Sequence, residues 1–237
     1  MKAVTVTFPP DRAAYYLNIF RKARYAAQKD AEDFLSICLA IEDFGGFLIG
    51  KRKSLNESRG EILKFLDADE DGDFYLNYER LREARNGASH EGPYARNAAA
   101  LSIDVSIEIE AALMKRVYKA KHIMSRGVEF AQPFDSLTKL RLKMLENSYS
   151  YLPFEIEGKF YFVSDLDIAK AFAKSSNRSE RESASFMRLI AVSDIACAEL
   201  ISEDMEISEI LKKDSWPLLV KNDAGHISGV ITAFDLL

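Results

Sequence analysis

Residues Trp216 to Leu237 read WPLLVKNDAGHISGVITAFDLL, and this stretch decides the fold expected for the second half of the chain. Two apolar runs flank a polar segment that contains Gly225, which is the pattern of two strands joined by a turn. A hydroxyl-x-x-Asp sequence, Thr232 to Asp235, follows the second run. Thr and Asp at this spacing are typical of the start of a helix. The stretch therefore predicts strand, turn, strand and helix start.

The same order of features occurs earlier in the chain, in residues 134–168, which read FDSLTKLRLKMLENSYSYLPFEIEGKFYFVSDLDI. In this piece and in residues 207–237, a helical segment leads to a Leu-Pro or Trp-Pro pair, two strands and a final hydroxyl-x-x-Asp. Ser164 and Asp167 are the final pair of the earlier copy. An internal repeat of this kind predicts one α/β unit present twice.

Both copies resemble CBS domains, and together they are similar to the tandem CBS module that binds adenine nucleotides in its cleft. The resemblance implies that the aspartate accepts hydrogen bonds from the ribose hydroxyls, while the hydroxyl residue and the helix start contact phosphate. These roles go to Thr232 and Asp235 in the second copy and to Ser164 and Asp167 in the first. AMP, ADP or ATP would be a regulatory ligand, and no cofactor is required.

Other observations leave this assignment open. A Thr or Ser and an Asp at a strand-to-helix turn cap helices in many α/β proteins, so each pair has a purely structural alternative. Tyr161 stands in the first copy where the second copy has Gly229, and its ring could fill the cleft. The sequence printed here ends at Leu237, so the helix that usually closes the second copy is absent or replaced by another segment.

In the first half, a polar sequence interrupts a series of helical segments: Arg85-Asn86-Gly87-Ala88-Ser89-His90. It resembles the Arg-Asn-x-x-x-His motif of the HEPN family, small four-helix proteins many of which are ribonucleases, over about residues 10–120. The resemblance implies a metal-independent endoribonuclease. In it Arg85 stabilises the phosphate charge, Asn86 positions the phosphate and His90 transfers a proton.

The second helical segment contains Glu42 and Asp43 within an otherwise apolar run. Since a buried carboxylate needs a partner, Arg85 is a candidate for one of them. The HEPN resemblance favours Glu42, with Asp43 in reserve, and the alternative places both on the solvated stripe of the helix. Residues five apart point about 140° from each other on a straight helix. Arg85 and His90 therefore require a bend between them or a symmetric homodimer with a composite cleft.

Apolar spacing predicts helices over residues 11–28, from the cap Asp30 to about Gly50, over 76–84, and over 96–121, although alternation within 103–109 also fits a strand. A short strand is expected at 4–8. The predicted fold class is α+β: an antiparallel helical bundle in residues 1–122 followed by the tandem CBS module in 123–237. The module divides into copy one at about 123–174, a polar linker at 175–190 and copy two at about 191–237.

Composition limits the remaining alternatives. A net charge of −5 argues against an extended surface for duplex DNA. The chain has no signal-like N-terminus and no long apolar run, and its two cysteines show no Cys-x-x-Cys spacing, so a cytoplasmic protein that does not bind membranes is expected. Residues 67–73 begin like an EF-hand loop, but the twelfth position is Tyr78, so a solvated acidic turn is favoured over a metal site.

The sequence predicts two alternative functions. The first is a nucleotide-sensing regulatory protein whose HEPN-like domain cleaves RNA under control of the CBS pair. The alternative is a non-catalytic adaptor in which the helical domain forms the homodimer and the CBS pair is a ligand-gated interaction platform.

Overall fold

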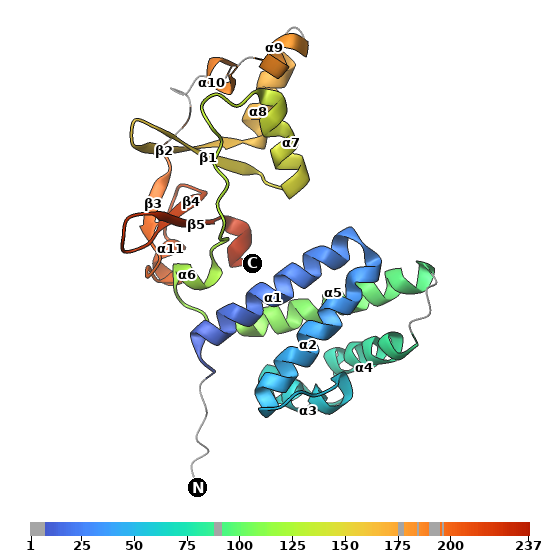
Figure 1. Ribbon diagram of the computed structural model, residues 1–237. Coiled ribbons are helices and arrows are strands. Elements are labelled where there is room, and N and C mark those ends of the chain that lie inside the picture. Colours follow the sequence, from blue (N-terminus) through green and yellow to red (C-terminus); the bar gives the residue numbers. More distant parts are fainter. Residues whose placement is uncertain (1–7, 88–91, 175–177, 184, 190–194, 196) are drawn as a thin grey trace. The chain divides into compact units, whose positions relative to one another are not determined.

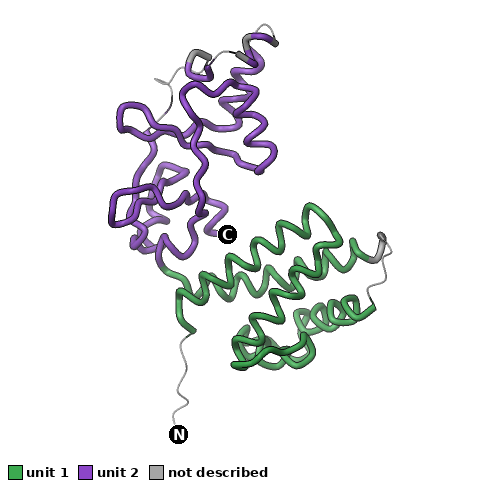
Figure 2. Tube along the Cα trace, in the orientation of Figure 1, with its two compact units in different colours: residues 1–118 green, residues 119–237 purple. Residues whose placement is uncertain are grey.

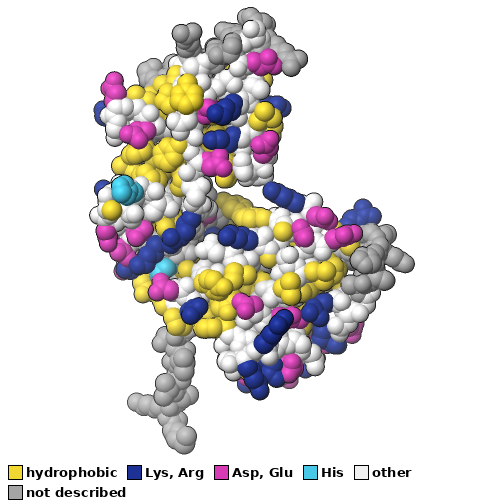
Figure 3. All heavy atoms as spheres, in the orientation of Figure 1, with side chains coloured by type: hydrophobic (Ala, Val, Ile, Leu, Met, Phe, Trp, Pro, Cys, Tyr) yellow, Lys and Arg dark blue, Asp and Glu magenta, His cyan; other side chains and the backbone are white. Residues whose placement is uncertain are grey.

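The computed structural model describes residues 8–87, 92–174, 178–183, 185–189, 195 and 197–237. The chain is a mixture of helices and strands that forms two compact units, residues 1–118 and 119–237 (Figure 2). The first unit is helical, and the second contains both strands and helices (Figure 1). Basic and acidic side chains are intermingled on both units on the face drawn in Figure 3.

Unit 1 contains five α-helices in its described part, and α5 packs against α1, α2 and α4. Their bounds are α1 Pro10–Lys29, α2 Phe34–Ile49, α3 Leu55–Leu66, α4 Asp73–Asn86 and α5 Gly92–Met114, with a 3₁₀ turn, η1, at Ala31–Asp33. Their contact faces bury aromatic rings: Phe20 and Phe44 are fully buried, and the Phe44 and Phe65 ring centroids lie 4.9 Å apart. This aromatic core joins α1, α2 and α3.

The helix ends follow local rules. Gly50 ends α2 in the left-handed region at φ 81°, where glycine has no steric cost. Ser54 and Glu57 form a capping box at the start of α3, a helix absent from the sequence expectations although Ser-x-x-Glu is its local signal. α4 begins at Asp73 rather than at residue 76, and α5 ends at Met114. In residues 103–109 the helical stripe prevails over the strand alternative, while residues 4–7 of the expected strand lie outside the described part.

Unit 2 contains two short sheets and the helices around them. The first repeat consists of α7 Leu137–Asn147, β1 Tyr151–Ile156, β2 Lys159–Ser164 and α8 Asp165–Lys174. The second repeat consists of β3 Glu199–Ser202, α11 Ile207–Ile210, β4 Leu218–Lys221, β5 Ile227–Ile231 and the 3₁₀ turn η3 Ala233–Leu236. α6 Ala120–Ile123 precedes them. The segment expected to be a polar linker, residues 175–190, contains two short helices in its described part, α9 Arg178–Ser183 and α10 Phe186–Leu189.

The two repeats exchange backbone hydrogen bonds. In the first sheet β1 and β2 are antiparallel; in the second, β3 is parallel to β4 and β4 is antiparallel to β5. Ser125, which precedes the first repeat, pairs with Val230 of β5 through bonds of 2.9 and 3.0 Å. Ala198, just before β3, donates to Phe160 of β2 at 2.7 Å. Each repeat therefore receives a segment that precedes the other, and this fixes the two repeats together within unit 2.

Within the residues that the structure describes, every helix is too short or too polar to traverse a lipid bilayer.

Candidate functional site

Arg85 and Glu42 form an ion pair in unit 1. Arg85 lies in the last turn of α4, and its Nη2 is 2.7 Å from Oε1 of Glu42 on α2. The side chains are 34% and 14% exposed, so the carboxylate is largely buried and the guanidinium reaches the surface. Among the described residues Glu42 Oε1 accepts no well-aligned hydrogen bond. The contact is therefore mainly Coulombic, and it leaves N–H donors of Arg85 able to bind an anion.

Two polar side chains lie beneath this pair, and neither can exchange a proton readily at neutral pH. Burial raises the pKa of the Cys38 thiol to about 12; the charge of Arg85 lowers it and that of Glu42 raises it. Burial also raises the pKa of Tyr78, whose hydroxyl donates to the Leu55 carbonyl at 2.8 Å. Neither side chain is therefore suited to act as a general acid or base at this position.

The Arg-Asn-x-x-x-His motif begins in the last turn of α4. Asn86 is the last residue of α4 and is exposed, and the amide of Gly87 closes the helix by donating to the Glu83 carbonyl at 2.9 Å. His90 lies in residues 88–91, outside the described residues. The helix that follows begins at Gly92, so the motif does not lie on one uninterrupted helix. Asp43, the reserve carboxylate, is exposed on α2.

In the first repeat of unit 2, Ser164 and Asp167 cap α8. Asp167 Oδ2 accepts from the Ser164 amide at 3.0 Å and from its hydroxyl at 2.6 Å, and Ser164 Oγ accepts from the Asp167 amide at 3.1 Å. This is the geometry of the helix-cap alternative. Among the described residues no hydrogen bond reaches the second oxygen of Asp167, Oδ1.

In the second repeat, both carboxylate oxygens of Asp235 are engaged. Oδ2 accepts from the Thr232 amide at 2.7 Å and from its hydroxyl at 2.8 Å. Oδ1 accepts from the Ser125 hydroxyl at 3.2 Å, and Asp235 is only 7% exposed. Ser125 is 110 residues away in sequence, and no local pattern indicated this contact. The two repeats thus differ at the aspartate, because Oδ1 of Asp235 accepts a hydrogen bond from the Ser125 hydroxyl, whereas Oδ1 of Asp167 accepts none from a described residue.

Tyr161 in the first repeat and the equivalent Gly229 in the second have different surroundings. The Tyr161 ring stacks on Phe154 with centroids 5.4 Å apart and an interplanar angle of 22°. At Gly229, an added Cβ would lie 2.6 Å from Sδ of Met124, so this side chain occupies the space that a larger residue would need. Met124 and Ser125 fall within the span expected for copy one, 123–174, but their contacts with the second repeat were not expected, because these contacts join segments that are distant in sequence.

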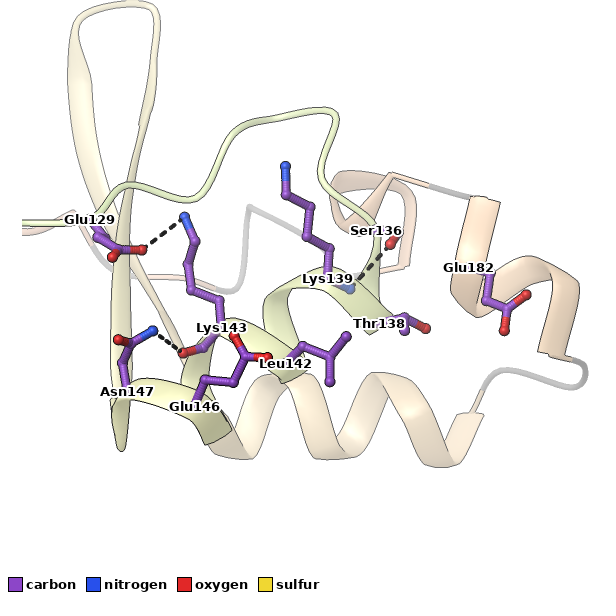
Figure 4. A pocket seen from close by; sticks show the side chains of 9 residues that line it. All are labelled: Glu129, Ser136, Thr138, Lys139, Leu142, Lys143, Glu146, Asn147 and Glu182. Carbon is purple, nitrogen blue, oxygen red and sulfur yellow. Dashed lines mark hydrogen bonds and ion pairs between the residues drawn. The ribbon is translucent and has the colours of Figure 1, made fainter. Parts of the chain in front are cut away.

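A shallow pocket of about 510 Å³ lies along α7 (Figure 4). The residues that line it are Glu129, Ser136, Thr138, Lys139, Leu142, Lys143, Glu146, Asn147 and Glu182, and this lining includes none of the four residues expected to bind nucleotide. Lys143 Nζ lies 3.3 Å from Glu129 Oε2, and Lys139 Nζ lies 2.6 Å from Asp135 Oδ1. Both lysines of the lining are thus paired with carboxylates.

The acidic turn of residues 67–73 joins α3 to α4, with Asp67 in the left-handed region at φ 55°. The described residues contain no group of three or more His, Cys, Asp or Glu side chains arranged to hold a metal ion.

No protein-family model and no curated protein matched the sequence. Among solved structures, a hemolysin-like protein containing a CBS domain from Oenococcus oeni is 16% identical with a TM-score of 0.40, covering 50% of this chain and 86% of that chain. The CBS domain of a bacterial CNNM/CorC family Mg²⁺ transporter in complex with ATP is 15% identical with a TM-score of 0.38, covering 50% and 83%. An acetoin utilization protein (AcuB) from Vibrio cholerae is 19% identical with a TM-score of 0.39, covering 49% and 85%. Solved structures similar to this chain thus include CBS-domain proteins that cover about half of it.

Proposed function

We propose that unit 2 is a CBS-type sensor of an adenine nucleotide and that unit 1 is a HEPN-like ribonuclease under its control. The observation that carries the sensor assignment is the repeated turn after the second strand of each hairpin, in which a hydroxyl residue and an aspartate meet at a helix start. A carboxylate oxygen at this position can accept hydrogen bonds from ribose hydroxyls, and the helix start favours phosphate.

The first repeat is the proposed nucleotide site. Asp167 keeps Oδ1 for a ligand, whereas a nucleotide at the second repeat would first have to displace the Ser125 hydroxyl from Asp235. Displacing an existing hydrogen bond reduces the net gain from forming a new one. We therefore expect one nucleotide to bind per chain with the higher affinity at Ser164 and Asp167.

Titration calorimetry of the full chain with AMP, ADP and ATP tests the sensor. Asp167→Asn keeps an oxygen for the cap but removes the charge, and we expect it to weaken nucleotide binding at least about tenfold. Asp165→Ala is the matched control, because it removes an exposed carboxylate two residues away, and it should bind like the original chain. Absence of heat with all three nucleotides, or equal binding by Asp167→Asn, would contradict the assignment.

The Glu42–Arg85 ion pair favours the ribonuclease assignment for unit 1. A buried carboxylate holds the guanidinium in place, and the exposed side of the guanidinium can stabilise the charge that develops on a phosphate during attack by the 2′-hydroxyl. In the proposal His90 moves the proton, Asn86 positions the phosphate and Glu42 orients Arg85.

Cleavage of single-stranded RNA by the full chain in the presence of EDTA tests this assignment. We expect Arg85→Ala and His90→Ala each to lower the cleavage rate about 100-fold. Arg80→Ala removes an exposed arginine from the same helix and should retain activity. A chain that binds nucleotide but leaves RNA intact, with or without His90→Ala, would favour the non-catalytic adaptor with its helical homodimer.

A further inference from the structure

One face of α4 carries a row of polar and aromatic side chains that leads to Arg85. Tyr75, Glu79, Arg82 and Asn86 recur at intervals of four, three and four residues, so they share a single stripe of the helix. The stripe is about 16 Å long at 1.5 Å per residue. Tyr75, Glu79 and Arg82 are all partly exposed, and Asn86 is exposed.

Glu79 organises two guanidinium groups on this face. Its Oε1 accepts from Arg59 Nη1 of α3 at 2.6 Å, and its Oε2 accepts from Arg82 Nε and Nη2 at 3.0 and 2.8 Å. Burial alone would raise the pKa of Glu79, but the hydrogen bonds from the two arginines lower it below its usual range. Glu83 Oε1 also lies 3.9 Å from Arg82 Nη2, so two carboxylates balance the charge of the two arginines, and both guanidinium groups are held in fixed positions with N–H donors to spare.

The row of side chains on α4 begins with an aromatic residue, Tyr75. The Arg59 guanidinium carbon lies 5.2 Å from the centroid of the Tyr75 ring. Partly exposed tyrosine and arginine planes placed together in this way are surfaces on which unpaired bases stack. Beyond Tyr75 the chain enters the acidic turn of residues 67–73, which repels phosphate and limits the row on that side.

We propose that this face of α4, formed by Tyr75, Arg82 and Arg59, binds the part of a single-stranded RNA that flanks the bond cleaved at Arg85. The proposal rests on the ribonuclease function proposed above and names its substrate as single-stranded. Arg82, three residues before Arg85, binds a phosphate next to the scissile one, and a base stacks at Tyr75. These residues bind substrate and take no part in the bond-breaking step.

Binding is measured by fluorescence anisotropy with a labelled oligouridine whose 2′-O-methyl groups prevent cleavage. We expect Arg82→Ala to weaken binding about fivefold or more and to reduce the slope of log affinity against log salt by about 0.7, as for one lost phosphate contact. Tyr75→Leu should weaken binding about fivefold or more, whereas Tyr75→Phe keeps the ring and should not. Arg80→Ala is the matched control, because position 80 lies about 160° from position 82 around the helix.

Glu79→Gln separates RNA binding from a structural role. Removing this negative charge should tighten RNA binding, whereas a purely structural ion-pair network would make Glu79→Gln and Arg82→Ala equally harmful. On cleavable RNA, Arg82→Ala should raise KM and leave kcat nearly unchanged.

The two proposals fail in different ways. If the original chain cleaves RNA but Arg82→Ala and Tyr75→Leu bind like Arg80→Ala, the binding face is wrong and the ribonuclease stands. If the chain binds the oligouridine through Tyr75 and Arg82 without cleaving RNA, the binding face stands and the ribonuclease is wrong. Equal binding of a polyglutamate peptide of the same charge would also overturn the assignment of this face to RNA.

Discussion

Glu110→Ala should lower the free energy of unfolding of unit 1 by about 3–5 kcal/mol, because it leaves a largely buried arginine, Arg24, without its partner. Glu110 lies on α5 and is 6% exposed. Its two oxygens accept from Nε and Nη2 of Arg24 on α1, both at 2.9 Å, and Oε1 also accepts from the Ser106 hydroxyl at 2.8 Å. Such a two-point pair fixes α1 against α5, and water cannot replace it without opening the bundle.

The unfolding of unit 1 can be distinguished from that of unit 2 within the same chain. Its single tryptophan, Trp216, lies in unit 2, so tryptophan fluorescence follows that unit, while most of the far-ultraviolet circular dichroism comes from helices and is sensitive to unit 1. In a urea titration, Glu110→Ala should shift the dichroism transition to lower urea and leave the fluorescence transition in place. Glu108→Ala, at an exposed position on the same helix, should change stability by no more than about 0.5 kcal/mol.

A double variant distinguishes the loss of a pair from the loss of packing. Replacing both Arg24 and Glu110 with apolar residues of similar size removes both charges together, and such replacements are often neutral or stabilising. We therefore expect Arg24→Met with Glu110→Leu to recover most of the stability lost in Glu110→Ala. If Glu110→Ala unfolds at the same urea concentration as Glu108→Ala, the ion pair contributes little to the bundle.

The sequence could predict the helices whose apolar stripes are long. The helix expected at 11–28 agrees with α1, and the segment from Asp30 to Gly50 agrees with η1 and α2, because several buried residues recur at helical spacing. α3 was not predicted, since only the Ser54 and Glu57 cap marks it locally. The repeated order of helix and hairpin in unit 2 could also be predicted, because each copy carries its own turn residues.

Contacts between distant segments could not be predicted in the same way. Arg24 and Glu110 are 86 residues apart, and Ser125 and Asp235 are 110 apart; local periodicity contains no information about either pair. The backbone pairing of Ser125 with β5 and of Ala198 with β2 could not be predicted for the same reason, because each pairing joins segments that are distant in sequence. The need of a buried carboxylate for a partner made Arg85 a candidate for Glu42 or Asp43, and the HEPN resemblance favoured Glu42; apolar spacing alone left Glu42 on either face of its helix.

The close approach of α2 to α3 is another feature that only the structure reveals, and Gly45 makes it possible. A Cβ added at Gly45 would overlap both Cβ and Oγ of Ser58, which is fully buried on α3. Ser58 cannot turn away, because its hydroxyl donates to the Ser54 carbonyl at 2.9 Å and its Cβ is fixed by the backbone. Gly45→Ala should therefore force the two helices apart, at a cost of about 3 kcal/mol.

Gly60 provides the matched control, because an added Cβ there meets nothing within 4 Å and the residue is exposed within α3. Gly60→Ala should stabilise unit 1 by about 0.5–1 kcal/mol through helix propensity, so the same substitution has opposite signs on neighbouring helices. Ser58→Gly added to Gly45→Ala should restore part of the loss, since it removes the overlapping atoms but places glycine inside a helix. If both alanine variants stabilise the dichroism transition, α2 and α3 can separate without cost and the packing argument fails.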